Sequence, residues 1–210
     1  MKTKDKDFIE LDFTGLLEDN QVFDTTSEKV AKDKNIYAEE NKDKFKPIKI
    51  NIGNNSLPKG FNQDLIDKET EKEFEITLEP KDGFGPRNPK LVRTVSSSQF
   101  KEQPYRGMLI DVNGMIAKVI SVSGGRATID MNNPLAGKTI KYQYTIKKII
   151  TVPKEKLEIL ADTFILPIEK IEKKEDKYQI KLKTEFPEKY LDKFKEKVKE
   201  LIKIDIEITK

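Results

Sequence analysis

The chain has 210 residues, of which 37% are charged and 36% hydrophobic, so its apolar side chains must be divided among small cores. Its 40 Lys and Arg residues nearly balance its 37 Asp and Glu residues, and the net charge of +3 gives no indication of a nucleic-acid partner. Because the sequence has no Cys and no His, it excludes disulfides, thiolate nucleophiles, imidazole catalysis and the commonest metal ligand. We expect neither a metal nor a cofactor.

The sequence contains no recognisable targeting segment. Its first residues, MKTKDKDF, lack the apolar run of a secretory signal. No stretch approaches the roughly 18 apolar residues that a membrane-spanning helix needs. These features predict a cytoplasmic protein with no membrane partner.

The N-terminal part of the chain begins with two strand patterns. Residues 8–13 place apolar side chains at every second position, which predicts a half-buried strand, and residues 22–24 predict a second strand after a polar turn. Residues 25–46 are charged and nearly without pattern. They predict a long surface excursion with a short helix around Val30.

Two further strands flank a short helical pattern. Residues 48–52 carry isoleucine at every second position, and residues 74–78 alternate in the same way. Between them Leu57, Phe61 and Leu65 recur every four residues, which places them on one face of a helix.

The chain changes character between residues 91 and 131. Asn113–Gly114 and Gly124–Gly125 each separate two apolar runs, and such dipeptides are strong signals for a β-hairpin. The segment therefore predicts a small, self-contained β unit.

The last part of the chain predicts one more strand of the first kind and then a separate unit. Residues 140–146 alternate strictly, and Pro153 indicates a domain boundary. The remainder predicts a helix, two strands, a helix and a strand. We interpret the apolar stripe of its second helix as covering its own sheet, with homodimerisation as the alternative.

Several short motifs, in this order and spacing, resemble the FKBP family. Residues 13–19 (FTGLLED) and 23–25 (FDT) resemble its opening. Residues 47–53 (PIKINIG) with Gly60-Phe61 resemble its next signature, and Phe84-Gly85 resembles its aromatic–glycine loop. The resemblance covers residues 1 to about 152 and extends to the remainder only in general shape.

The run NNPLAGK at residues 132–138 indicates the subfamily. It resembles the Asn-His-Pro-Leu-Ala-Gly run that closes the inserted flap domain of SlyD-like FKBPs, with Asn133 in place of His. The excursion after Thr25 and the extra C-terminal domain resemble the long archaeal members.

The resemblance implies an α+β fold: an FKBP-like twisted antiparallel sheet wrapped on a short helix, with an inserted small all-β domain and a C-terminal α/β domain. It implies a discontinuous isomerase domain of residues 1–87 and 136–152, an insert-in-flap chaperone domain of residues 88–135, and a C-terminal α+β domain of residues 153–210.

The resemblance also implies a function. We expect a peptidyl-prolyl cis–trans isomerase that acts on X–Pro bonds in unfolded or nascent polypeptides and accelerates their folding, with capture of unfolded chains by the insert. The alternative is a holdase chaperone with weak or vestigial isomerase activity.

The family pattern assigns three sets of residues. The catalytic set is Asp24, Phe23, Phe61, Tyr142, Phe84 and Phe13. The substrate-binding set is Ile48, Leu57, Pro58 and Ile140. The chaperone surface of the insert is Leu91, Val92, Phe100, Tyr105, Met108, Leu109 and Ile110.

Periodicity alone would assign the aromatic residues to an ordinary core, and Asp24 to a turn or a helix cap. The family pattern places them in a site whose chemistry needs no nucleophile, because rotation about a prolyl bond breaks no covalent bond.

Four pocket residues depart from the family pattern, and one of them, Phe61, replaces the common Trp or the Leu of SlyD-like members, a change that packing should tolerate. Phe13 and Phe84 stand where many members carry Tyr, and Pro58 stands where a backbone N–H usually bonds the substrate. Because each lost hydrogen bond costs about 0.5–1.5 kcal/mol of binding, we predict weak binding of macrolides such as rapamycin.

Overall fold

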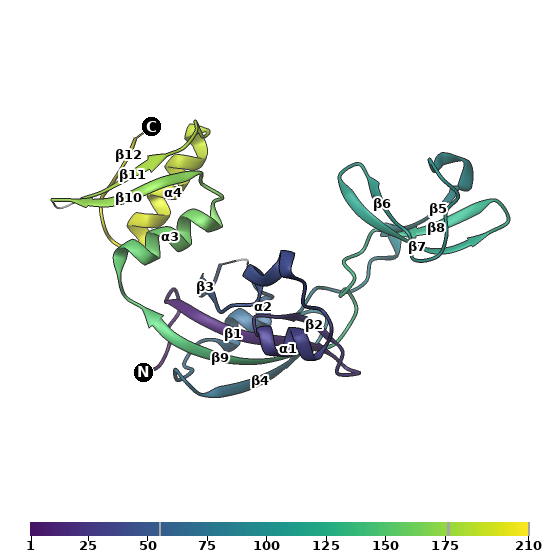
Figure 1. The fold of residues 1–210 in the computed structure, drawn as a ribbon, viewed down its shortest axis with the longest axis horizontal. Coiled ribbons are helices and arrows are strands. Elements are labelled where there is room, and N and C mark those ends of the chain that lie inside the picture. Colours follow the sequence, from purple (N-terminus) through teal and green to yellow (C-terminus); the bar gives the residue numbers. More distant parts are fainter. Residues whose placement is uncertain (55, 176, 210) are drawn as a thin grey trace. The chain divides into compact units, whose positions relative to one another are not determined.

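The structure is a computed structural model that describes residues 1–54, 56–175 and 177–209. The contacts within the chain define two compact units (Figure 1). The first contains Met1–Thr77 and Ile140–Lys210, and the second contains Leu78–Thr139. Mainly antiparallel sheets and a few helices make up the described chain, which confirms the predicted α+β class.

The first unit is built around a five-stranded sheet. Its central strands are β1 (Phe8–Leu17) and β9 (Ile140–Ile150), which pair antiparallel along their length. β2 (Val22–Thr25) and β3 (Ile48–Asn51) pair with opposite ends of β1, and β4 (Glu73–Leu78) lies beyond β9. The strands predicted in these regions are confirmed, and β1 and β9 are longer than predicted.

A single short helix covers one face of this sheet. Helix α2 (Lys59–Asp64) carries Phe61, which is fully buried and contacts the rings of Phe13 and Tyr142. Because side chains alternate along a strand, Leu11 and Phe13 of β1 lie on the same face as Tyr142 and Tyr144 of β9, and Phe13 and both tyrosines contact Phe61 of this helix. The predicted helix is confirmed, although Leu57 precedes it.

The excursion after β2 contains two short helical turns. Helix α1 (Glu28–Asp33) confirms the short helix predicted around Val30, and a 3₁₀ helix follows at Glu39–Lys44. The hydroxyl of Ser27 caps α1 by accepting a hydrogen bond from the backbone N–H of Val30.

The second unit contains a four-stranded antiparallel sheet of order β5-β8-β7-β6. Its strands are β5 (Val92–Ser96), β6 (Leu109–Val112), β7 (Met115–Ser123) and β8 (Arg126–Asp130). Short 3₁₀ helices, Pro89–Leu91 and Ser97–Gln99, flank β5.

Turn residues in the second unit adopt the backbone that the sequence predicts. Asn113 and Gly114 have φ of 54° and 80°, as a tight turn between β6 and β7 requires. Five buried apolar side chains form the core of the unit: Ala117, Val119, Ala127, Ile129 and Met131.

The segment after β9 adds two helices and a three-stranded sheet. In chain order these are α3 (Pro153–Thr163), β10 (Ile168–Lys174), β11 (Lys177–Leu182), α4 (Glu188–Leu201) and β12 (Ile206–Thr209). The order helix, two strands, helix, strand is the predicted one. α4 connects β11 to β12, and these two strands are parallel.

The core of this C-terminal segment includes two residues of the main sheet. Phe8 of β1 and Ile150 of β9 are buried with Leu157, Ile180 and Phe194 in one hydrophobic cluster. The predicted domain limits, at Pro153 and around the insert, stay predictions. In the part of the chain that the structure describes, no helix is long and apolar enough to cross a membrane.

Candidate active site

Four of the six residues predicted to be catalytic form one aromatic cluster. The rings of Phe61 and Tyr142 stack with centroids 4.3 Å apart. Phe13 and Phe23 each meet Tyr142 edge-on at 5.7 Å, and Phe13 also meets Phe61 at 6.1 Å. Edge-on and stacked contacts of this kind fix the orientation of each ring. The cluster is apolar, and Phe13, Phe61 and Tyr142 are buried in it while Phe23 is half-buried.

The register of the central strands explains why these rings meet. In the β1–β9 pair, Phe13 lies opposite Tyr144 and Gly15 lies opposite Tyr142, so all four share one face. Gly15 leaves room for the ring of Phe23, because a Cβ at this position would lie 2.5 Å from Phe23 Cζ. Our sequence reasoning did not single out Gly15 as a site residue.

Asp24 lies beside this cluster on β2 and keeps access to solvent. Desolvation by the surrounding protein raises the pKa of its carboxyl, while a backbone hydrogen bond at Thr25 and the charge of Lys44 oppose that rise. Burial also raises the pKa of the Tyr142 hydroxyl, and the Asp24 carboxylate raises it further. Asp24 and Tyr142 are therefore electrostatically coupled.

The loop before α2 carries two of the predicted substrate-binding residues, Leu57 and Pro58, both half-buried. The side chain of Asn62 holds this loop. Its Oδ1 accepts from the Gly53 N–H at 3.1 Å, and its Nδ2 donates to the carbonyls of Asn54 and Leu57 at 2.8 and 3.0 Å. Asn62 was also missed from the sequence, where a helical Asn gives no signal of what it bonds.

The remaining predicted pocket residues lie in different settings. Ile140 is fully buried in β9, and Ile48 is half-buried in β3. Phe84 is half-buried in a turn of the second unit, so its part in the site stays a prediction.

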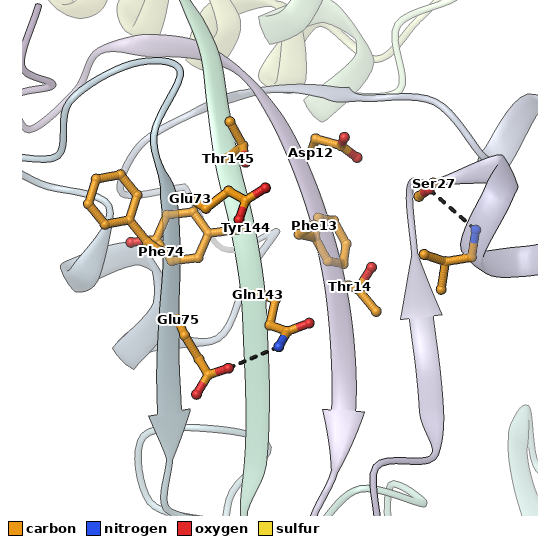
Figure 2. A pocket seen from close by; sticks show the side chains of 11 residues that line it. Asp12, Phe13, Thr14, Ser27, Glu73, Phe74, Glu75, Gln143, Tyr144 and Thr145 are labelled. Atoms are coloured by element: carbon orange, nitrogen blue, oxygen red, sulfur yellow. Dashed lines mark hydrogen bonds between the residues drawn. The ribbon is translucent and has the colours of Figure 1, made fainter.

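A shallow cavity of about 450 Å³ lies on the opposite face of the sheet (Figure 2). Asp12 and Gln143 line it, and Phe13 and Tyr144, which alternate with them along β1 and β9, also contribute to its lining. Glu75 accepts a hydrogen bond from Gln143 at 2.9 Å across it. This cavity is polar and cannot supply the dry surroundings that favour a twisted amide.

The residues predicted to form the chaperone surface divide into two groups. Tyr105 and Leu109 are 63% and 66% exposed, whereas the others are half-buried. A second cavity, of about 430 Å³, is lined by Phe100, Met108 and Ile110 among others. Exposed hydrophobic side chains beside an apolar cavity are typical of a binding surface.

The comparisons with known proteins agree with this architecture. Residues 1–104 match the profile of the family described as FKBP-type peptidyl-prolyl cis-trans isomerase. The short-type peptidyl-prolyl cis-trans isomerase of Methanocaldococcus jannaschii is 34% identical over 150 residues, which cover 70% of this chain and 93% of that protein.

Bacterial relatives are less similar. The FKBP-type 16 kDa peptidyl-prolyl cis-trans isomerase of Escherichia coli is 28% identical over 119 residues, or 53% of this chain and 80% of that protein. The SlyD protein of Treponema pallidum is 29% identical over 103 residues, or 46% of this chain and 58% of that protein. With the aromatic cluster and the sheet on helix α2, these matches show that the chain belongs to the FKBP-type peptidyl-prolyl cis–trans isomerases, enzymes that act on proline-containing polypeptides.

Proposed function

We propose that the aromatic cluster around Phe61 is the active site of this isomerase. The observation that carries the proposal is the stacking of Phe61 on Tyr142 at 4.3 Å, with Phe13 and Phe23 edge-on to Tyr142. A substrate proline would lie at the margin of this cluster, where Phe23 and Leu57 are only half-buried.

The chemistry follows from the change in polarity during rotation. The planar amide is strongly polar, and the barrier of about 18–20 kcal/mol reflects its resonance. The twisted amide has lost this resonance, so an apolar wall destabilises it less than it destabilises the planar forms. Asp24 adds to this effect, because its carboxylate repels the negative carbonyl oxygen more strongly in the planar state.

Refolding of a protein limited by a prolyl isomerisation tests the site. The enzyme, added at a small fraction of the substrate concentration, should accelerate refolding with turnover. Phe61→Ala and Asp24→Ala should each lower kcat/KM by about tenfold or more, equivalent to at least about 1.4 kcal/mol. Tyr190→Ala removes a tyrosine that is 53% exposed on α4 and serves as the matched control. Full activity of Phe61→Ala would place the site elsewhere.

We further propose that the insert captures unfolded segments at the β6–β7 hairpin. β6 is an edge strand, so its outer backbone groups can pair with an extended chain. Leu109 and Ile116 lie near each other on its outer face and are 66% and 70% exposed. The apolar cavity beside Met108 lies on the inner face. An extended segment bound at β6 would therefore pair with the backbone of this strand and also contact apolar side chains beside it.

A pair of surface variants separates capture from catalysis. Replacing Leu109 and Ile116 with Ser should raise KM on an unfolded protein several-fold and leave the kinetics on a short proline peptide unchanged. Val122→Ser is the control, since Val122 lies on β7 like Ile116 but is only 40% exposed. Deletion of residues 88–134 should have the same selective effect in a stronger form. An equal loss on both substrates contradicts capture by the hairpin.

A holdase with weak isomerase activity remains the second candidate. The observation that favours it is the lack of three donors, since Pro58 has no backbone N–H and neither Phe13 nor Phe84 has a hydroxyl. Suppression of aggregation at equimolar concentration, without accelerated refolding at low concentration, would support this candidate. The same lack of donors predicts weak rapamycin binding, and nanomolar affinity by calorimetry contradicts that prediction.

A further inference from the structure

Tyr144 lies next to the proposed active site, on the same face of β9 as Tyr142. Its side chain is 3% exposed, and its ring meets Phe61 edge-on at 5.0 Å, whereas Tyr142 stacks on Phe61 at 4.3 Å. Phe61 is therefore in contact with both tyrosines of β9. The hydroxyl of Tyr144 donates a hydrogen bond of 2.5 Å to Oδ2 of Asp64.

Asp64 is the last residue of α2 and follows Phe61 by three positions, so the two side chains lie on neighbouring parts of the helix surface. The other carboxylate oxygen of Asp64 is 2.9 Å from Nζ of Lys68. Lys68 in turn lies 5.1 Å from the ring centre of Phe74, and Phe74 stacks on Tyr144 at 5.5 Å. Tyr144, Asp64, Lys68 and Phe74 thus contact one another in a closed cycle at the C-terminal end of α2.

The hydroxyl of Tyr144 is held in its protonated, donating form. Burial disfavours the phenolate of Tyr144, and the hydrogen bond to the Asp64 carboxylate raises the pKa of the hydroxyl further. The hydroxyl thus remains a donor at neutral pH.

A six-residue helix depends on contacts of this kind. α2 is too short to be stable by itself, so its rotation about its own axis is set by what holds its side chains. We propose that Asp64 and Tyr144 are positioning residues, whose hydrogen bond fixes the rotation of α2 and so holds the ring of Phe61 against Tyr142. This inference rests on the proposed role of Phe61 in the isomerase site.

Removal of one hydroxyl tests the proposal. Tyr144→Phe keeps the ring but loses the hydrogen bond, and kcat/KM on a proline peptide should fall about threefold to tenfold. The fall should lie mostly in kcat, because a displaced ring weakens binding of the twisted amide more than binding of the planar substrate. Asp64→Asn retains an acceptor oxygen and should be closer to wild type than Asp64→Ala.

A double-mutant cycle then identifies the pair. Tyr144→Phe combined with Asp64→Ala should be no slower than the slower single variant, because both remove the same hydrogen bond. Tyr190→Phe removes an exposed hydroxyl on α4 and serves as the control. All rates are measured at a temperature at which circular dichroism shows each variant to be folded. Additive effects overturn the proposal, as does a lower Tm of Tyr144→Phe with unchanged kcat and KM.

The position of the ring can be observed without activity. The sequence has no Trp, so Phe61→Trp introduces a single tryptophan at the site, which can be excited selectively over the tyrosines. Its anisotropy should decay faster when Tyr144→Phe is added, and an unchanged decay counts against positioning. If Phe61→Ala keeps full activity, the proposed site and this inference both fail. If only Tyr144→Phe keeps full activity, the site stands and the positioning role fails.

Discussion

At the scale of single residues, the ring of Phe23 occupies the space that a side chain at position 15 would need, and Gly15 leaves that space open. A Cβ on Gly15 would lie within 3.0 Å of three ring carbons of Phe23. Because the clashing atoms belong to the side chain of Phe23, the ring can rotate away without a shift of the backbone. Its contact with Tyr142 at 5.7 Å would change as it moves.

We therefore predict that Gly15→Ala displaces the ring of Phe23 in the proposed active site. The expected result is a loss of kcat/KM of about tenfold, with a modest fall in the free energy of unfolding. Refolding assays and urea titration measure the two quantities. Adding Phe23→Leu to Gly15→Ala should relieve the clash and restore part of the stability that the alanine variant loses.

The Asp24 carboxyl makes the stability of the fold depend on pH. Its pKa in the folded protein is raised above the ordinary value of 3.8, chiefly by desolvation. Below pH 3.8 the carboxyl is neutral in both states and has no effect on stability. As the pH rises through the raised pKa, ionisation favours the unfolded chain, so this group lowers the free energy of unfolding.

Asp24→Asn should remove this dependence. The stability of the wild type relative to this variant should fall as the pH rises above 3.8 and then become constant above the folded pKa. Urea unfolding at a series of pH values measures it. A difference that grows in favour of the wild type with rising pH would show that the Asp24 carboxylate is stabilised by the fold.

At the scale of elements, helix α2 and the loop before it behave as one piece. Asn62 joins them through three hydrogen bonds to the backbone of Gly53, Asn54 and Leu57. It is 9% exposed, so water replaces these bonds poorly when the side chain is removed.

Asn62→Ala should loosen the loop that carries Leu57 and Pro58. We expect a fall of about 1–3 kcal/mol in the free energy of unfolding and a higher KM for peptides. Asn62→Asp keeps the acceptor for the Gly53 N–H but loses both donations, so its KM should also rise. Gln63→Ala, on the exposed side of the same helix, is the control. Equal KM values for Asn62→Ala and the wild type contradict the proposed role of the loop in substrate binding.

At the scale of the whole molecule, the C-terminal segment shares its core with the isomerase sheet. Phe8 and Ile150 are 1% and 3% exposed and belong to the same cluster as Leu157. Ion pairs between Lys6 and Glu200 and between Lys49 and Glu155 also join the two parts, but these side chains are solvent-exposed and contribute little.

A chain that ends at Val152 should therefore be less stable, because truncation exposes Phe8 and Ile150. We expect Tm to fall by about 4 °C or more, which corresponds to at least about 1 kcal/mol. Substituting Phe8 with Ser in the truncated chain should then restore solubility but not Tm. An unchanged Tm on truncation would show that the packing of the segment on Phe8 and Ile150 does not stabilise the rest of the chain. Light scattering on both chains tests homodimerisation, and an unchanged monomer mass eliminates it.

Much of the architecture is predictable from local pattern. The alternation over residues 8–13 and 140–146 identified the two central strands, and Asn113–Gly114 identified the β6–β7 hairpin. Both strands extend beyond the pattern, because the sheet register continues past the strictly alternating residues. The aromatic residues of the site were found through motif spacing, since periodicity describes them equally well as core.

The sequence by itself determined the strands, the short helix, the inserted β unit and the family, because each depends on residues that are close along the chain. Only the tertiary structure decided what lies beside Phe61. Tyr144 and Asp64 are 80 residues apart, and the clearance between Gly15 and Phe23 depends on a register shift between β1 and β2. Side-chain hydrogen bonds and close approaches of this kind depend on three-dimensional packing, and no local pattern encodes them.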